Sequence, residues 1–311
     1  MIFSKEHKLY YRIFLFIGAT VFLLGCQNST KTKNQSIDSN QQQSATDHHM
    51  GTDSLSQYWV QYNFNDTLLI KDPNQGEQRF VDFIAAFPQY SITTVSNAIT
   101  EMLKKAEVNA TVFQFFKEKY AHYLYDPNSP MRNEWYYEPV LTYLVQSPSS
   151  TDTDKIRYKM QLDMVRKNQP GTTITDFQYL TSTGKKEKLH DSQGLMRLIV
   201  FYDPTCSHCK EIIGTLKTSE LLNSFIAKKQ IKVIAIDPLG DQNLWKDYQP
   251  GIPSNWTNGF DDRDVLIKKQ LYSLSAYPTL YVIDANNNVI SKDPDYQIAL
   301  NILDRHLNVV K

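Results

Sequence analysis

The residues best suited to chemistry are two cysteines separated by two residues, in the segment Cys206-Ser207-His208-Cys209. Such a pair either forms a reversible disulfide or supplies two thiolate ligands to a metal ion. The chain contains 3 cysteines, too few for a disulfide-rich scaffold or for a four-thiolate zinc site. Zinc would need further ligands, and the nearest histidines, His190 and His208, lack ligand spacing. We therefore predict no metal site and no cofactor other than a redox-active disulfide.

The cysteine pair is expected where a strand meets a helix. Residues 195–202 form a largely apolar run that is typical of a buried strand, and helical spacing continues from Lys210. Unsatisfied N–H groups and the dipole at a helix N-terminus stabilise the thiolate, which is the form that attacks disulfides. We expect Cys206 to attack a partner disulfide, Cys209 to resolve the mixed disulfide, and His208 to stabilise the thiolate.

The rest of the C-terminal half alternates between short apolar runs and helical patterns. This alternation predicts an α/β sheet. We expect strands at 231–236 and 279–283, helices at 264–274 and 297–307, and a turn at Asn286-Asn287-Asn288.

Residues 58–168 have a different pattern, in which apolar and aromatic residues recur at helical spacing. Asn109 precedes one such run as a predicted N-cap, and Pro170-Gly171 ends the last one. We predict an all-helical domain over 58–168, with no convincing catalytic cluster.

Residues 1–25 have the pattern of an export signal, in which a basic start leads into an apolar run that ends at Leu23-Leu24-Gly25-Cys26. The apolar run of residues 13–24 is shorter than the ~20 residues of a spanning helix. A membrane-anchor helix is therefore the weaker interpretation, and an ordinary cleaved signal peptide with a free cysteine is a further alternative. Residues 26–57 are rich in Ser, Thr, Asn, Gln and Lys, which predicts a flexible tether.

Composition limits the function classes. The 33 basic and 33 acidic residues give a formal net charge of zero, which argues against a strongly basic nucleic-acid binder. A length of 311 residues is consistent with about two domains.

The Cys-Ser-His-Cys segment after an apolar strand, with Ala276-Tyr277-Pro278-Thr279 before a later strand, resembles the thioredoxin superfamily. The resemblance covers residues 169–311. It implies a thioredoxin-like α/β domain at the C-terminus, preceded here by the all-α domain. In this superfamily a cis proline lies beside the active-site disulfide, which implies that role for Pro278. By the same resemblance, Tyr277 and Thr205 bind the substrate chain.

Two positions depart from the thioredoxin pattern. Thioredoxins usually have Trp before the first active-site cysteine, where this chain has Thr205, and a buried acid six residues before it, where this chain has Val200. Asp203 either replaces that acid or forms a turn with Pro204, and we favour the turn. These departures affect the rate and direction of electron flow rather than the thiol chemistry.

The N-terminal segment Leu23-Leu24-Gly25-Cys26 resembles the lipobox of bacterial lipoproteins, which implies lipidation of Cys26 and membrane anchoring. Residues 171–184 resemble the first hairpin of TlpA/ResA-type proteins. Lipobox, tether, helical domain and thioredoxin-like domain together resemble tethered lipoproteins that are common in Bacteroidetes. Gln27 after the lipidated residue favours the outer membrane, facing the periplasm.

We therefore expect a membrane-tethered periplasmic thiol-disulfide oxidoreductase that acts on protein or small thiol and disulfide substrates. It would need an upstream redox partner of unknown identity. We expect no nucleic-acid partner. The alternative is a non-enzymatic periplasmic interaction lipoprotein in which the cysteine pair is a structural disulfide. A structural disulfide resists reduction, whereas a catalytic one exchanges readily.

Overall fold

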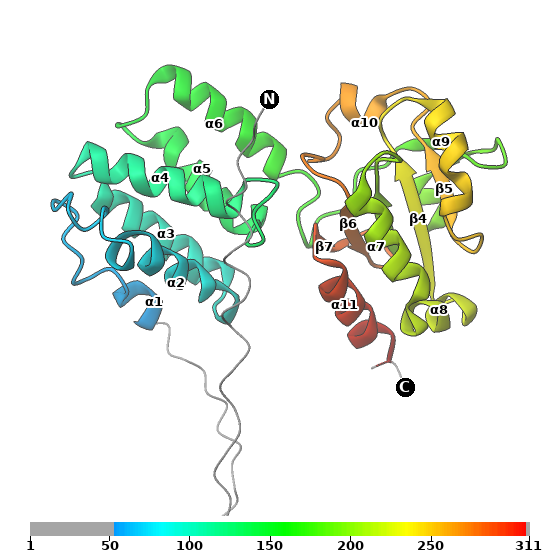
Figure 1. Cartoon of the computed structure of the whole chain (residues 1–311), viewed down its shortest axis with the longest axis horizontal. Coiled ribbons are helices and arrows are strands. Elements are labelled where there is room, and N and C mark those ends of the chain that lie inside the picture. The colour runs from blue at the N-terminus through cyan, green and yellow to red at the C-terminus, as the bar shows by residue number, and fades with distance from the viewer. Residues whose placement is uncertain (1–52, 309–311) are drawn as a thin grey trace, which may run out of the picture. The chain divides into compact units, whose positions relative to one another are not determined.

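The computed structural model describes residues 53–308. The expected signal peptide, Cys26 and most of the expected tether therefore lie outside the described residues. Within 53–308, an all-helical domain is followed by a mixed sheet with helices, as the sequence predicted (Figure 1). No helix in this part of the chain is long and apolar enough to cross a membrane.

The helical domain contains six α-helices, a π-helix at Asn74–Gln78 and a 3₁₀ turn at Phe87–Gln89. The α-helices are α1 (Asp53–Gln57), α2 (Arg79–Ala85), α3 (Ile92–Ala106), α4 (Ala110–Leu124), α5 (Glu134–Gln146) and α6 (Asp152–Val165). Helix α1 lies in the segment that we expected to be tether. Its Leu55 side chain is buried in the domain core, so the domain begins before the predicted boundary at Tyr58.

Side-chain caps start the longer helices of this domain. The Asn109 side chain accepts hydrogen bonds from the N–H groups of Thr111 and Val112, which confirms the predicted N-cap of α4. The side chains of Ser91, Asn133 and Thr151 do the same for α3, α5 and α6. These caps satisfy N–H groups that have no partner within the helix.

The core of the helical domain is built on aromatic rings. Phe116 on α4 is fully buried, and its ring centroid lies 5.3 Å from that of Trp59 and 5.8 Å from that of Phe64. Most of these rings meet edge to face or tilted, arrangements that aromatic pairs prefer. The concentration of Phe, Tyr and Trp in this region therefore forms a core.

The C-terminal domain is organised around a seven-stranded sheet with the order β2-β1-β5-β4-β3-β6-β7. Its strands are β1 (Gln178–Thr181), β2 (Lys186–Lys188), β3 (Met196–Phe201), β4 (Ile231–Asp237), β5 (Thr257–Phe260), β6 (Thr279–Ile283) and β7 (Val289–Lys292). Strand β3 pairs in parallel with β4 and antiparallel with β6. Every residue of β3 is buried, as the apolar run predicted.

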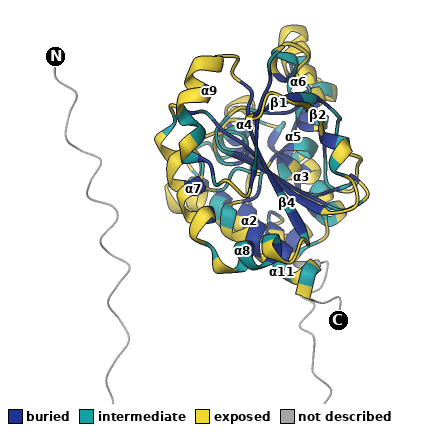
Figure 2. Cartoon of the chain, turned by 90° about the vertical axis from the view of Figure 1, so that its right-hand side faces the viewer, coloured by how far each residue is buried: buried dark blue, intermediate teal, exposed yellow. Residues whose placement is uncertain are grey.

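Helices and loops cover both faces of this sheet. Leu198 and Val200 of β3 belong to one hydrophobic cluster, whereas Ile199 and Phe201 belong to another, because successive side chains of a strand point to opposite faces. Figure 2 shows the buried strand β4 and the exposed outer surfaces of α7, α8 and α9. The helices of this domain are α7 (Ser207–Thr218), α8 (Glu220–Ala227), α9 (Gln242–Tyr248), α10 (Val265–Lys268) and α11 (Tyr296–Asn308).

Two of the elements that differ from the sequence prediction are α10 and β5. The helix expected over 264–274 is only the short α10, because Asp264 and Gln270 adopt positive φ angles of 54° and 48° on either side of it. Strand β5 was missed because its Thr-Asn-Gly-Phe sequence is typical of a turn. The surroundings favour glycine at position 259 in β5, since a Cβ there would lie 2.5 Å from Ile236 Cδ1 and 2.7 Å from Cδ2 of the buried Tyr179 ring.

We predict that Phe116→Ala destabilises the helical domain by about 3–5 kcal/mol, because it leaves a cavity among the aromatic rings. Phe115→Ala is the matched control, since Phe115 is adjacent but only partly buried. Urea unfolding of both variants measures the difference. Equal losses of unfolding free energy would contradict the assignment of Phe116 to the centre of the core.

Candidate active site at Cys206 and Cys209

A tight turn connects β3 to the cysteine pair. The Asp203 carboxylate accepts hydrogen bonds from the backbone N–H and the hydroxyl of Thr205, each at 2.7 Å. The Cys206 N–H donates to the Asp203 carbonyl at 3.1 Å. Asp203 therefore makes the turn, as we favoured, and Thr205 lies exposed at its tip.

Cys206 is the N-cap residue of α7. Its Sγ atom accepts a hydrogen bond from the Cys209 N–H at 3.1 Å, so an N–H group of the first helical turn points at the sulfur. Both cysteines are free thiols; Cys206 is partly exposed and Cys209 is buried. The pair thus combines one sulfur that solvent can reach with one that it cannot.

The buried sulfur has a shifted acidity. Burial raises the pKa of the Cys209 thiol, and the nearby Cys206 raises it further, while a backbone hydrogen bond from Asp203 opposes the change. Cys209 is therefore held as a neutral thiol at neutral pH. A neutral thiol next to an accessible sulfur gives the two cysteines different chemical roles.

The sheet brings the proline segment to the same place. Strand β6 pairs with β3 in a register that sets Thr279 opposite Phe201, so the residues before β6 lie beside those after β3. The Tyr277–Pro278 peptide bond is cis. The Cys206 thiol lies 3.7 Å from the Tyr277 carbonyl oxygen, to which it can donate a hydrogen bond. Two motifs that are far apart in the sequence therefore meet at one sulfur atom.

His208 lies on the exposed side of α7. Its side chain is 62% exposed, and its Nδ1 atom lies 3.4 Å from a carboxylate oxygen of Glu211. The structure thus keeps His208 near the cysteine pair but engages its ring with Glu211.

Val200 is fully buried, so the position of the usual thioredoxin acid is apolar. A different buried carboxyl, Asp237, ends the neighbouring strand β4 and is 1% exposed. Burial raises the pKa of Asp237 to about 6, although a hydrogen bond from the Leu239 N–H opposes this. Its charge in turn raises the pKa of Tyr277, after the larger effect of burial. The sequence offered one signal for Asp237, a carboxyl directly after a buried strand.

A zinc site at the pair would need further ligands. In the described range, 53–308, no three or more His, Cys, Asp and Glu side chains are grouped so that they could hold a metal ion. The ring of His190 instead forms a hydrogen bond of 2.9 Å with the Ile174 carbonyl oxygen.

Comparison with known proteins agrees with this arrangement. Residues 54–168 match a family described as a domain of unknown function (DUF5106), and residues 194–289 match a family described as thioredoxin-like. A crystal structure of a thioredoxin-like protein from Bacteroides caccae is 33% identical, with a TM-score of 0.78, over 81% of this chain and 91% of that chain. The chain belongs to the thioredoxin-like proteins.

Two further similar structures each cover less than half of this thioredoxin-like protein. The C-terminal domain of an uncharacterised protein from Bacteroides fragilis is 36% identical, with a TM-score of 0.43, over 44% of this chain and 97% of that chain. The thioredoxin domain of a thiol-disulfide oxidoreductase from Bacteroides vulgatus is 18% identical, with a TM-score of 0.40, over 45% of this chain and 98% of that chain. No curated protein matches the sequence.

We predict that Asp237 makes the stability of this thioredoxin-like protein depend on pH. Because the folded-state pKa is raised from 3.8 to about 6, the folded protein keeps a proton that the unfolded chain releases, and stability falls as pH rises through this window. Asp237→Asn should therefore raise the free energy of unfolding at pH 7.5 by about 3 kcal/mol, at 1.36 kcal/mol per pKa unit, and change it little at pH 4.

Urea unfolding at the two pH values checks this expectation. Asp247→Asn is the control, because Asp247 is an exposed carboxylate on α9. An Asp237→Asn effect of the same size at both pH values would contradict the role of its ionisation.

Proposed function

We propose that this protein is a thiol-disulfide oxidoreductase that exchanges disulfides through Cys206 and Cys209. The observation that carries the proposal is the asymmetry of the pair: Cys206 is partly exposed at the start of α7, whereas Cys209 is buried and neutral. A structural disulfide does not require an accessible first cysteine, but an attacking sulfur does.

The reaction follows from this asymmetry. The Cys206 thiolate attacks one sulfur of the substrate disulfide, which forms a mixed disulfide and expels the other substrate sulfur as a thiolate. Cys209 then loses its proton and attacks Cys206 Sγ, which forms the Cys206–Cys209 disulfide and releases the second substrate thiolate. Two electrons pass from the protein to the substrate, and the released thiolates take up protons. The reverse sequence oxidises a dithiol substrate.

The backbone around the pair supports binding of an extended substrate. The residue before the cis proline places its carbonyl oxygen beside Cys206, and the exposed Thr205 lies immediately before Cys206 in sequence. We infer that Tyr277 pairs through its backbone with the substrate chain, while Thr205 and Pro278 shape the surface around the attacked bond. His208, being exposed on the first turn of α7, would add positive charge near the thiolate when it is protonated.

The proposed location is the cell envelope. The apolar run before Leu-Leu-Gly-Cys supports export and lipidation at Cys26, which would tether the protein to the outer membrane facing the periplasm. Protein or small-molecule disulfides would then be the substrates. A separate redox partner would restore the starting state of the pair after each turnover.

We predict that Cys206→Ser reduces the dithiothreitol-dependent reduction of insulin to the uncatalysed rate, because the attacking sulfur is lost. The matched variant Cys209→Ala keeps the attacking sulfur and should accumulate a mixed disulfide with insulin, visible on non-reducing gels and by mass spectrometry. All proteins carry Cys26→Ser, so that no third thiol contributes. Undiminished activity of Cys206→Ser would overturn the proposed function.

A further inference from the structure

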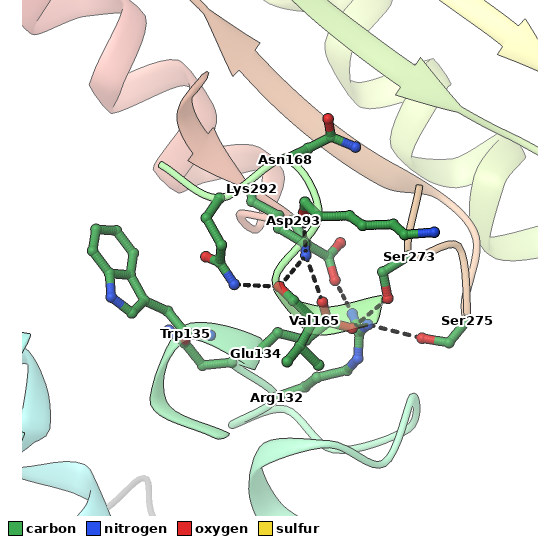
Figure 3. A network of polar contacts seen from close by, with 12 residues as sticks. Arg132, Glu134, Trp135, Val165, Asn168, Ser273, Ser275, Lys292 and Asp293 are labelled. Atoms are coloured by element: carbon green, nitrogen blue, oxygen red, sulfur yellow. Dashed lines mark hydrogen bonds and ion pairs between the residues drawn. The ribbon is translucent and has the colours of Figure 1, made fainter. Parts of the chain in front are cut away.

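A buried cluster of charged residues connects the DUF5106 helical domain to the thioredoxin-like domain. We call Arg132, Glu134, Lys292 and Asp293 the charged cluster; its contacts are among the dashed lines of Figure 3. The side chains of Arg132, Glu134 and Lys292 are 9%, 3% and 4% exposed. Two positive and two negative groups balance, which allows such charges to be buried.

Glu134 lies at the centre of the charged cluster. One of its carboxylate oxygens accepts hydrogen bonds from Arg132 Nη2 at 2.8 Å and from the Ser273 hydroxyl at 2.7 Å. The other oxygen forms an ion pair with Lys292 Nζ at 2.9 Å. Because Glu134 begins α5, the helix N-terminus adds a favourable field for its negative charge.

Lys292 fixes the end of α6 against β7. Its Nζ atom donates to the carbonyl oxygens of Val165 at 2.9 Å and Lys167 at 2.8 Å. Val165 is the last residue of α6 and Lys167 lies two residues after it, where carbonyl groups lack partners within the helix. The contacts therefore bind two helices of the helical domain to one strand of the sheet.

Arg132 reaches the loop that leads to the cis proline. Its Nη2 atom donates to the Ser275 hydroxyl at 2.8 Å, and its Nη1 atom pairs with Asp293. Ser275 lies two residues before Tyr277, whose carbonyl oxygen contacts the Cys206 thiol. The helical domain thus contacts the loop at Ser273 through Glu134 and at Ser275 through Arg132.

The energetics of buried charges indicate what this contact does. Three of the four charged side chains are removed from water and Asp293 is 22% exposed, and this desolvation costs much of what their mutual attraction gains, so such clusters add little stability. Their directional hydrogen bonds do fix the relative position of the groups they join, and the planar guanidinium of Arg is suited to this. A loop that must hold a carbonyl beside a reactive sulfur needs such positioning.

We propose that the helical domain positions the redox site, with Arg132 as the positioning residue that holds the 273–278 loop beside Cys206. The proposal rests on the proposed disulfide exchange. It gives the DUF5106 domain a function within the enzyme: residues of that domain set the geometry of the cis-proline loop without contacting the substrate.

Two variants test the proposal in the full chain carrying Cys26→Ser. Ser275→Ala removes one hydroxyl from an exposed residue, and Arg132→Lys keeps the charge but loses the planar fork. We expect each to lower kcat/KM for insulin reduction about tenfold, because small displacements of reacting groups have effects of this size or larger. We also expect both variants to change the rate at which iodoacetamide alkylates Cys206, because the Tyr277 carbonyl that accepts a hydrogen bond from the Cys206 thiol would move.

Arg166→Lys is the matched control, because Arg166 is in the same domain and pairs with Glu138 instead of the loop. Thermal unfolding separates positioning from stability: Ser275→Ala should keep the wild-type melting temperature while its activity falls. If Ser275→Ala kept the wild-type kcat/KM and the wild-type alkylation rate, this inference would be overturned while the proposed function would stand. We expect Arg132→Lys to give the same result as Ser275→Ala. An inactive wild type would overturn the proposed function and this inference together.

Discussion

The site depends on the position of one sulfur atom, Cys206 Sγ, at the start of α7. The Cys209 N–H donates to it, and the Tyr277 carbonyl lies within hydrogen-bond distance of it. The donor comes from the first turn of α7 and the acceptor from the loop before β6, so the sulfur is held between two parts of the sheet domain. Any change in how β3 and β6 pair would move both groups. The fully buried residues of β3 therefore support the chemistry by fixing this register.

The two cysteines differ because their surroundings differ. Four residues of one segment place Cys206 at the helix cap and turn Cys209 inward, where burial raises the pKa of its thiol. Val200, at the position where thioredoxins usually have a buried acid, is apolar and fully buried. Asp237 is a buried carboxyl at the end of the adjacent strand, and burial raises its pKa to about 6, so its charge varies near neutral pH. Ionisation of Asp237 therefore lowers the stability of the folded protein, whereas ionisation of a paired surface carboxylate raises it.

Much of this arrangement was predictable from local sequence patterns. The apolar run ending before Cys206, the Asn109 cap and the Thr279–Ile283 strand are all encoded by neighbouring residues, and the structure confirms them. Strand β5 was not predictable, because Gly259 is selected by the side chains of Tyr179 and Ile236 rather than by strand propensity. The contacts of Arg132, Glu134 and Lys292 join residues more than a hundred positions apart, so no local pattern reveals them.

The most direct test of the central claim is the reduction potential of the Cys206–Cys209 pair, measured by equilibration with dithiol and glutathione buffers. A pair with an accessible attacking sulfur should equilibrate rapidly and reversibly, at a potential between about −270 and −120 mV, the range of thioredoxin-like reductants and oxidants. A potential below about −300 mV, with slow exchange, is the behaviour of a structural disulfide and would contradict the account.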